Sequence, residues 1–132
     1  MRRVLVVDDD PDIREMLAHQ LGREGYTVIL ARDGAEAMVR LAEGRAPDAI
    51  VLDLGMPNMS GWQFRDLQKR DPRLAGIPVV VMTGQSPLGI DVQHVLEKPF
   101  TIERLVETIR RITAPAERSR ARRRRTVASP EA

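Results

Sequence analysis

The sequence predicts an α/β domain built on a doubly wound, five-stranded parallel sheet. Short apolar runs alternate with segments whose apolar residues recur at helical spacing, which is the pattern of strand–helix units. The apolar runs are continuous rather than alternating, as expected of strands that helices cover on both faces of a sheet. The expected strands span residues 3–8, 26–31, 48–53, 78–82 and 94–97.

The first two helices are predicted from the residues at their N-termini. Asp10 is a good N-cap, and Pro11 suits the first position of a helix. Asp33 and Glu36 have the spacing of a capping box, which predicts that a second helix begins there. The apolar faces of these two helices are predicted at Ile13, Met16, Leu17 and Leu21, and at Ala37, Met38 and Leu41.

Two further helices are predicted in the second half of the chain. Ser60 and Gln63 have the spacing of another capping box, at the start of the third helix. A last helix is expected over residues 101–112. The apolar residues of the third helix are Trp62, Phe64 and Leu67.

The connection between the fourth and fifth strands is irregular. Only 14 residues separate Thr83 from Lys98, and they include two glycines and a proline without helical periodicity. A parallel crossover normally needs a dozen or more residues and usually contains a helix. We therefore expect a loop or a single helical turn over residues 84–93, where the other units have a full helix.

Charge is distributed unevenly along the chain. The formal net charge is +2, but residues 1–112 carry 15 Lys and Arg against 17 Asp and Glu, whereas residues 113–132 carry six Arg against two Glu. We therefore expect a folded domain over 1–112 and a disordered Arg-rich tail over 113–132. The tail is either a solvated segment or a contact for nucleic-acid phosphates, and it has no aromatic residues between its arginines that could stack on bases.

The composition excludes several classes of protein. The chain of 132 residues contains no cysteine, which excludes a disulfide framework and thiolate metal sites. No apolar run reaches the roughly 20 residues needed to span a bilayer. The run after Met1-Arg2-Arg3 is too short for the apolar region of a signal peptide. A soluble, cytoplasmic, single-domain protein is expected.

Polar residues follow four of the predicted strands, at the point where each strand ends. Asp8 and Asp9 end the first strand, Asp53 ends the third, and Thr83 and Lys98 follow the fourth and fifth. Because the carboxyl ends of parallel strands share one edge of a sheet, these side chains should meet there. Carboxylate oxygens suit Mg²⁺, and a hydroxyl and an ammonium suit a phosphoryl group. The alternative for the acid run is a helix-capping cluster, the role we assign to Asp10 alone.

Four stretches of the sequence, in this order, resemble the receiver domain of bacterial two-component response regulators. The resemblance covers residues 3–112, and it implies a flavodoxin-like sheet with strand order 2-1-3-4-5. It also implies a protein that takes a phosphoryl group from a histidine kinase or phosphotransfer protein onto an aspartate, with Mg²⁺ bound. The stretches are VLVVDDDP at 4–11, LDLGMPNMSG at 52–61, VMTG at 81–84 and EKPF at 97–100.

The resemblance assigns a role to each of the polar residues. Asp53 is the phosphoacceptor, and Thr83 and Lys98 contact the phosphoryl oxygens, so that the domain promotes its own phosphorylation and dephosphorylation rather than acting as a conventional turnover enzyme. Pro99 is implied to follow a cis peptide bond. The implied metal ligands are Asp8 (through a water), Asp9, Asp53 and the Gly55 carbonyl.

The sequence departs from the family pattern at the region that usually relays the signal. Receivers typically have an aromatic residue three positions before the lysine, where this chain has Val95, and they have a longer fourth helix. We expect a single-domain response regulator that signals by partner binding or by passing the phosphoryl group on. The alternatives are a receiver-like body whose tail binds nucleic acid, and an interaction module that is not phosphorylated.

Overall fold

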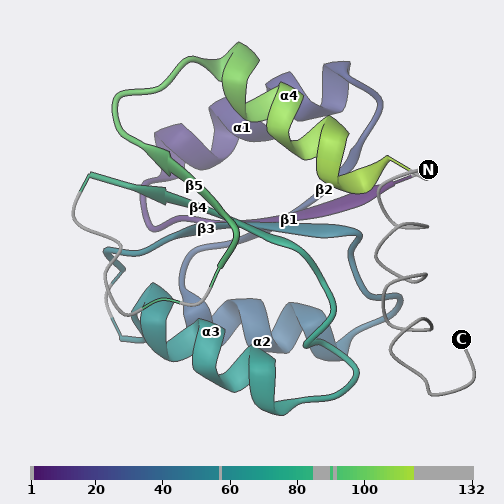
Figure 1. Cartoon of the computed structure of the whole chain (residues 1–132), viewed down its shortest axis with the longest axis vertical. Helices are drawn as coiled ribbons and strands as arrows, with labels where there is room; N and C mark the ends of the chain where they lie inside the picture. Colours follow the sequence, from purple (N-terminus) through teal and green to yellow (C-terminus); the bar gives the residue numbers. More distant parts are fainter. Residues whose placement is uncertain (1, 57, 85–89, 91, 115–132) are drawn as a thin grey trace, which may run out of the picture.

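The computed structural model describes residues 2–56, 58–84, 90 and 92–114. It contains a five-stranded, fully parallel sheet with the order β2-β1-β3-β4-β5 (Figure 1). The predicted fold class is confirmed, and each strand boundary lies within one residue of the expected one. The strands are β1 (Arg3–Val7), β2 (Thr27–Ala31), β3 (Ala49–Asp53), β4 (Val79–Thr83) and β5 (His94–Glu97).

The order of the strands in the sheet changes direction at β1. β1 pairs with β2 on one side and with β3 on the other, so the chain first moves outward and then returns across β1. In open parallel sheets, ligands bind outside the carboxyl ends of the strands at such a point. In the register of the neighbouring pairs, Asp53 lies opposite Met82, and Thr83 lies opposite Glu97.

Helices cover both faces of the sheet, and the described residues contain four of them. They are α1 (Pro11–Arg23), α2 (Gly34–Ala42), α3 (Gly61–Arg70) and α4 (Ile102–Thr113), of which the last corresponds to the helix predicted over 101–112. Figure 1 shows α1 and α4 on one face and α2 and α3 on the other. The sheet is therefore the middle layer of three.

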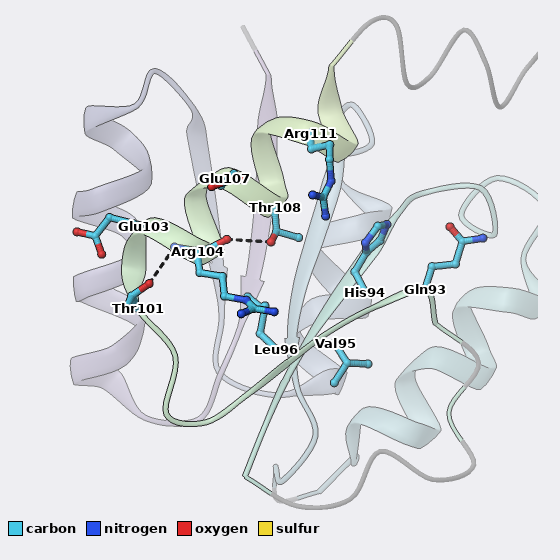
Figure 2. A pocket seen from close by; sticks show the side chains of 10 residues that line it. All are labelled: Gln93, His94, Val95, Leu96, Thr101, Glu103, Arg104, Glu107, Thr108 and Arg111. Atoms are coloured by element: carbon cyan, nitrogen blue, oxygen red, sulfur yellow. Dashed lines mark hydrogen bonds between the residues drawn. The ribbon is translucent and has the colours of Figure 1, made fainter.

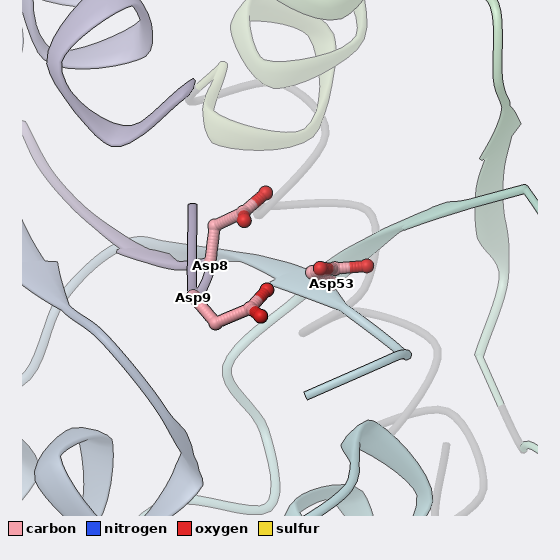
Figure 3. Close-up of side chains that lie close together, drawn as sticks. All are labelled: Asp8, Asp9 and Asp53. Atoms are coloured by element: carbon pink, nitrogen blue, oxygen red, sulfur yellow. The ribbon is translucent and has the colours of Figure 1, made fainter. Parts of the chain in front are cut away.

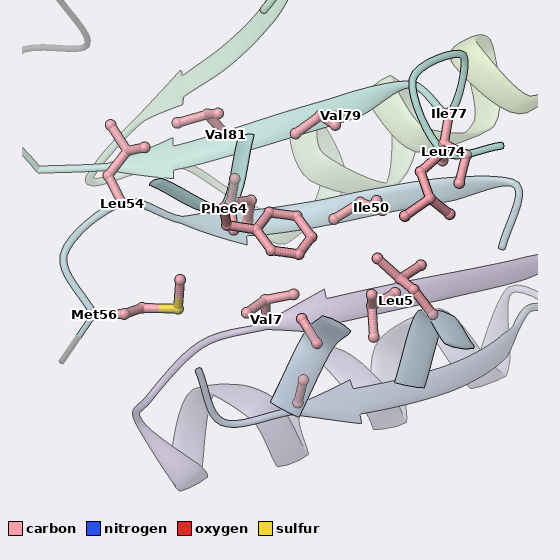
Figure 4. Packing of buried hydrophobic residues seen from close by; sticks show 14 residues of the cluster. Leu5, Val7, Ile50, Leu54, Met56, Phe64, Leu74, Ile77, Val79 and Val81 are labelled. Atoms are coloured by element: carbon pink, nitrogen blue, oxygen red, sulfur yellow. The ribbon is translucent and has the colours of Figure 1, made fainter. Parts of the chain in front are cut away.

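Each face of the sheet has its own buried apolar cluster. Val4 and Val6 of β1 pack in the cluster with α1 and α4, whereas Leu5 and Val7 pack in the cluster with α2 and α3 (Figure 4). Successive side chains of a strand point to opposite faces, so one continuous apolar run serves both layers. All five residues of β3 are buried, which holds the backbone that ends at Asp53 in the centre of the fold.

The helices begin where the capping residues predicted them, with one difference in how a cap is made. The Ser60–Gln63 capping box is complete, and the Asp10 side chain accepts from the Asp12 amide. Asp33 accepts from the Glu36 amide at 2.8 Å. The reciprocal half of that second box is absent, because Glu36 Oε1 accepts from the Arg32 amide, one residue before the cap.

Two apolar residues predicted to face the core are exposed. Met16 of α1 is 48% exposed and Leu67 of α3 is 39% exposed. The residue after Leu67, Gln68, is buried instead, and its Nε2 donates to the carbonyls of Leu74 at 2.9 Å and Ile77 at 3.0 Å. A polar side chain is stable in this core because its amide satisfies two buried carbonyls.

The expected loop between β4 and β5 lies mostly outside the described residues. Of residues 84–93, the structure describes Gly84, Ile90, Val92 and Gln93, and none of these is helical. The expected Arg-rich tail also lies outside the described part of the chain, apart from Thr113 and Ala114. Thr113 ends α4, and it is buried with its Oγ1 at 3.2 Å from the Tyr26 hydroxyl. Among the described residues, no helix is long and apolar enough to cross a membrane.

Candidate functional site

The five polar residues predicted to converge lie at one edge of the sheet. Asp8 and Asp9 directly follow β1, Asp53 is the last residue of β3, and Thr83 is the last residue of β4. Lys98 directly follows β5, and its amide donates to the Thr83 carbonyl at 2.7 Å. The topology that was predicted from alternating strands and helices therefore brings these residues together.

Three carboxylates form the centre of the site. Asp8, Asp9 and Asp53 each offer an oxygen, and these oxygens all lie within 4.8 Å of one another (Figure 3). Asp8 is 1% exposed and Asp53 is 7% exposed, whereas Asp9 is exposed to solvent. The group therefore has a buried side and an open side from which a ligand can enter.

The environment of Asp8 disfavours its charged form. The pKa of Asp8 is raised from the ordinary 3.8 to about 6, chiefly by burial and also by the negative charges of Asp53 and Asp9. Hydrogen bonding from the Asp10 amide and the positive charge of Lys98 lower this pKa in part. A cation near Asp8 would remove this penalty, because it favours the carboxylate form.

One oxygen of Asp8 is left without a partner. Asp8 Oδ1 accepts from the Asp10 amide at 2.9 Å, but Asp8 Oδ2 is buried and has no hydrogen-bond partner in the described part of the chain. A buried carboxylate oxygen without a partner is unfavourable unless a water or an ion supplies one. The unsatisfied oxygen and the three converging carboxylates fit a hard divalent cation such as Mg²⁺ and the waters it retains.

Asp53 contacts the cation that follows β5 as well as belonging to the acidic group. Lys98 Nζ is 3.7 Å from Asp53 Oδ1, and the Gly55 amide donates to the same oxygen at 3.3 Å. Burial raises the pKa of Asp53, and the charge of Asp9 adds to the rise, whereas Lys98 and the Gly55 amide lower it. Thr83 is 1% exposed at the neighbouring strand end. The Lys98–Pro99 peptide bond is cis, as the family resemblance implies.

Two residues that support the site were not singled out from the sequence. Arg14 of α1 donates to the Asp8 carbonyl at 2.7 Å, although its position in the sequence indicates only a solvent-facing helical residue. Gly61 begins α3 against the backbone that carries Asp53. A Cβ at Gly61 would lie 2.8 Å from Leu54 Cα and 3.0 Å from the Asp53 carbonyl, so no side chain fits there. The sequence feature that could have indicated Gly61 is its position directly after Ser60, the N-cap of α3.

A groove of about 580 Å³ lies away from this site, between β5 and α4 (Figure 2). Its walls carry charges of both signs, from Arg104 and Arg111 and from Glu103 and Glu107. Val95, at the position where receivers typically have an aromatic residue, also lines the groove and is half-buried. The groove contains none of the residues predicted for phosphoryl chemistry.

Comparison with known proteins identifies the family to which this arrangement belongs. Residues 4–110 match the family model of the response regulator receiver domain. The response regulator MprA of Mycobacterium ulcerans is 40% identical over 116 residues, which cover 82% of this chain and 48% of that protein. MprA of Mycobacterium sp. strain KMS is 40% identical over 126 residues, which cover 87% and 53%. The chain therefore spans about half the length of these curated relatives.

Solved structures agree with the sequence match. The chemotaxis protein CheY4 of Vibrio cholerae aligns with a TM-score of 0.77 at 32% identity, over 85% of this chain and 98% of that one. A receiver domain of a histidine kinase from Syntrophus aciditrophicus aligns with a TM-score of 0.82 at 31% identity, over 89% and 94%. The response regulator TrrA of Thermotoga maritima, solved in complex with Mg²⁺-BeF, aligns with a TM-score of 0.74 at 30% identity, over 85% and 99%. From its sequence match, its sheet order and the polar residues at its strand ends, this chain belongs to the response regulator receiver domain family.

Proposed function

We propose that this receiver domain accepts a phosphoryl group on Asp53 from a histidine kinase or a phosphotransfer protein, in a reaction that depends on Mg²⁺. The observation that carries the proposal is the position of Asp53, which lies within 4.8 Å of the oxygens of two further aspartates and 3.7 Å from an ammonium nitrogen. A carboxylate in this setting can act as a nucleophile without a separate base.

The transfer is a displacement at phosphorus. An oxygen of Asp53 forms a bond to the phosphorus of a phosphohistidine, and the phosphorus–nitrogen bond breaks. The electron pair of that bond stays on the imidazole nitrogen, which then takes up a proton. Lys98 and Thr83 contact the phosphoryl oxygens, and the 3.7 Å from Lys98 Nζ to Asp53 Oδ1 leaves the ammonium beside the charge that develops.

Asp8, Asp9, Asp53 and the Gly55 carbonyl would hold the metal ion. Bound Mg²⁺ supplies positive charge that offsets the repulsion between the carboxylates and the phosphoryl group. The unsatisfied Asp8 Oδ2 and the raised pKa of Asp8 support this assignment, since both are relieved by a cation. The complex of TrrA with Mg²⁺-BeF supports it by similarity.

We infer that the signal leaves the domain by partner binding or by onward phosphoryl transfer. In this chain Val95 borders the groove, its short aliphatic side chain packs against the apolar cluster on the α2 and α3 face, and it offers no aromatic ring to swing inward. The groove carries charges of both signs from α4, and these suit a protein partner of mixed charge. Binding of nucleic acid by the tail stays a separate prediction, because residues 115–132 lie outside the described part of the chain.

The experiment that tests the proposal compares three proteins by intact mass after incubation with acetyl phosphate and Mg²⁺. Wild type should gain the mass of one phosphoryl group, and Asp53→Asn, which keeps the size of the side chain, should gain none. Asp66→Asn is the matched control, since Asp66 is an exposed aspartate of α3 paired with Arg70. Labelling of Asp53→Asn at the wild-type rate would refute Asp53 as acceptor, and failure of wild type to label with donor and Mg²⁺ would favour the interaction module that is not phosphorylated.

A further inference from the structure

The loop between β3 and α3, which carries Gly55, lies against the N-terminus of α2. Asn58 Nδ2 donates to Asp33 Oδ2 at 3.2 Å. Next to this bond, Met59 covers Gly34 so closely that a Cβ at Gly34 would lie 2.7 Å from Met59 Sδ. The loop and the helix are therefore fitted together by one polar and one apolar contact.

Asp33 serves two elements at the same time. Its Oδ1 accepts from the Glu36 amide at 2.8 Å and so caps α2, while its Oδ2 accepts from Asn58. Asp33 is only 7% exposed, so these two hydrogen bonds replace those that an exposed carboxylate would make with water. The cap of α2 is thus joined to a loop about 25 residues further along the chain.

The backbone of Asn58 is also in a special conformation. Its φ is +67°, in the left-handed region that asparagine tolerates better than most other residues. The hydrogen bond to Asp33 helps to hold this conformation, because it fixes the side chain of the same residue. Without this bond, fewer interactions would hold the loop in its present conformation.

The part of the loop nearer to the site is tied to β3. The Leu54 carbonyl accepts from the Met56 amide and from the Gly61 amide, each at 3.1 Å, and the Gly55 amide donates to Asp53 Oδ1. Both ends of the loop are therefore fixed on the backbone of Leu54. The contact of Asn58 with Asp33 ties the loop to α2, and it lies three residues from Gly55.

We propose that Asp33 and Asn58 are positioning residues, which hold the β3–α3 loop so that the Gly55 backbone faces the Mg²⁺ site. This inference rests on the proposed function, because it concerns the same metal site. Neither residue is among the carboxylates that converge there, so both act through the loop. If the position of the loop affects Mg²⁺ affinity, thermodynamic linkage requires that bound Mg²⁺ also stabilises the loop. Through Asn58, bound Mg²⁺ should then stabilise the first turn of α2.

Two variants separate this role from the stability of the helix. Asn58→Gly removes the amide but keeps a residue that accepts a positive φ. Asp33→Ser keeps a capping oxygen for the Glu36 amide but removes the oxygen that receives Asn58. In both, the Mg²⁺ dissociation constant measured by calorimetry on the full chain should rise by about 3- to 10-fold, the range for loss of one hydrogen bond.

Thr101→Ala is the matched control. Thr101 caps α4, on the opposite face of the sheet from α2 and α3, by accepting from the Arg104 amide at 3.1 Å. Its loss should lower stability to a similar degree and leave the Mg²⁺ dissociation constant unchanged. Hydrogen exchange of the Glu36 amide in wild type gives a second readout, which should slow when Mg²⁺ is added.

The possible results distinguish this inference from the proposed function. If wild type binds Mg²⁺ and is phosphorylated on Asp53, but both variants bind Mg²⁺ as wild type does, the positioning role is overturned and the function stands. An unchanged exchange rate at the Glu36 amide upon addition of saturating Mg²⁺ also overturns it, even where a variant fails to fold. Absence of Mg²⁺ binding by wild type overturns both.

Discussion

The ammonium of Lys98 lies 3.7 Å from the Oδ1 atom of Asp53, although β4 lies between the strands that carry the two residues to the site. The contact is possible because β5 ends one residue before Lys98, and because the Lys98 amide is bonded to the Thr83 carbonyl at the end of β4. It is the basis of the first prediction.

Replacement of Lys98 by alanine should slow the phosphorylation of Asp53 by acetyl phosphate about 10²-fold, since it removes a fixed positive charge from the place where phosphoryl charge develops. The Mg²⁺ dissociation constant should not rise, because the acidic residues are unchanged. Rates from intact mass and calorimetry on the same samples give both values. Lys69→Ala, at an exposed residue of α3, is the control and should behave as wild type. A wild-type rate in Lys98→Ala would exclude this role.

The acidic site should destabilise the metal-free protein as pH rises. The pKa of Asp8 is raised from 3.8 to about 6 in the folded state, chiefly by burial. The stability linked to this group is therefore fully present below pH 3.8 and is lost as pH rises through about 6. Asp8→Asn cannot undergo this loss, so it should be more stable than wild type at pH 7.5 by on the order of 1–3 kcal/mol.

Urea denaturation in the presence of a chelator checks this difference. At pH 4 the two proteins should unfold at similar urea concentrations, and the gap should open between pH 4 and pH 7. Saturating Mg²⁺ should narrow the gap, because the ion stabilises wild type by binding only its folded state. A gap that does not vary with pH would mean that Asp8 is not the titrating group.

Gly61→Ala should lower the free energy of unfolding. It should also slow phosphorylation, because the added Cβ displaces the backbone that carries Asp53. The added Cβ would lie 2.6 Å from Leu54 Cδ2 and 2.8 Å from Leu54 Cα, and the second contact is with backbone that cannot turn away. A loss of about 1–3 kcal/mol in the free energy of unfolding is expected from such overpacking. Gly22→Ala is the control, since a Cβ at that position of α1 meets nothing within 4 Å. It should stabilise the protein slightly.

The buried Gln68 should resist replacement by an apolar residue of similar size. Gln68→Leu removes the donor from the buried carbonyls of Leu74 and Ile77, so the free energy of unfolding should fall by about 1–3 kcal/mol. Leu67→Gln, at the neighbouring 39% exposed position, should change it by less than about 0.5 kcal/mol. Equal midpoints for the two variants in urea would contradict the assignment of the buried face of α3.

The sequence by itself determined the fold class and the members of the candidate site. Each of Asp8, Asp53, Thr83 and Lys98 stands at the end of an apolar run, and parallel strands bring their carboxyl ends to one edge. This inference needs only the alternation of strands and helices, which local patterns of apolar residues reveal. The starts of the helices were predicted for the same reason, since Asp10 and Ser60 act on amides within three residues along the chain.

The tertiary structure decided what depends on contacts between distant segments. The spacing of apolar residues on α3 is compatible with Leu67 facing inward, but the carbonyls of Leu74 and Ile77 select Gln68 for that place. The bond between Asp33 and Asn58 joins residues 25 positions apart, and the raised pKa of Asp8 arises from burial among strands that meet only in the folded chain. Local periodicity specifies which residues are apolar, whereas the rotation of each helix and the charge state of each buried group are set by the groups packed against them.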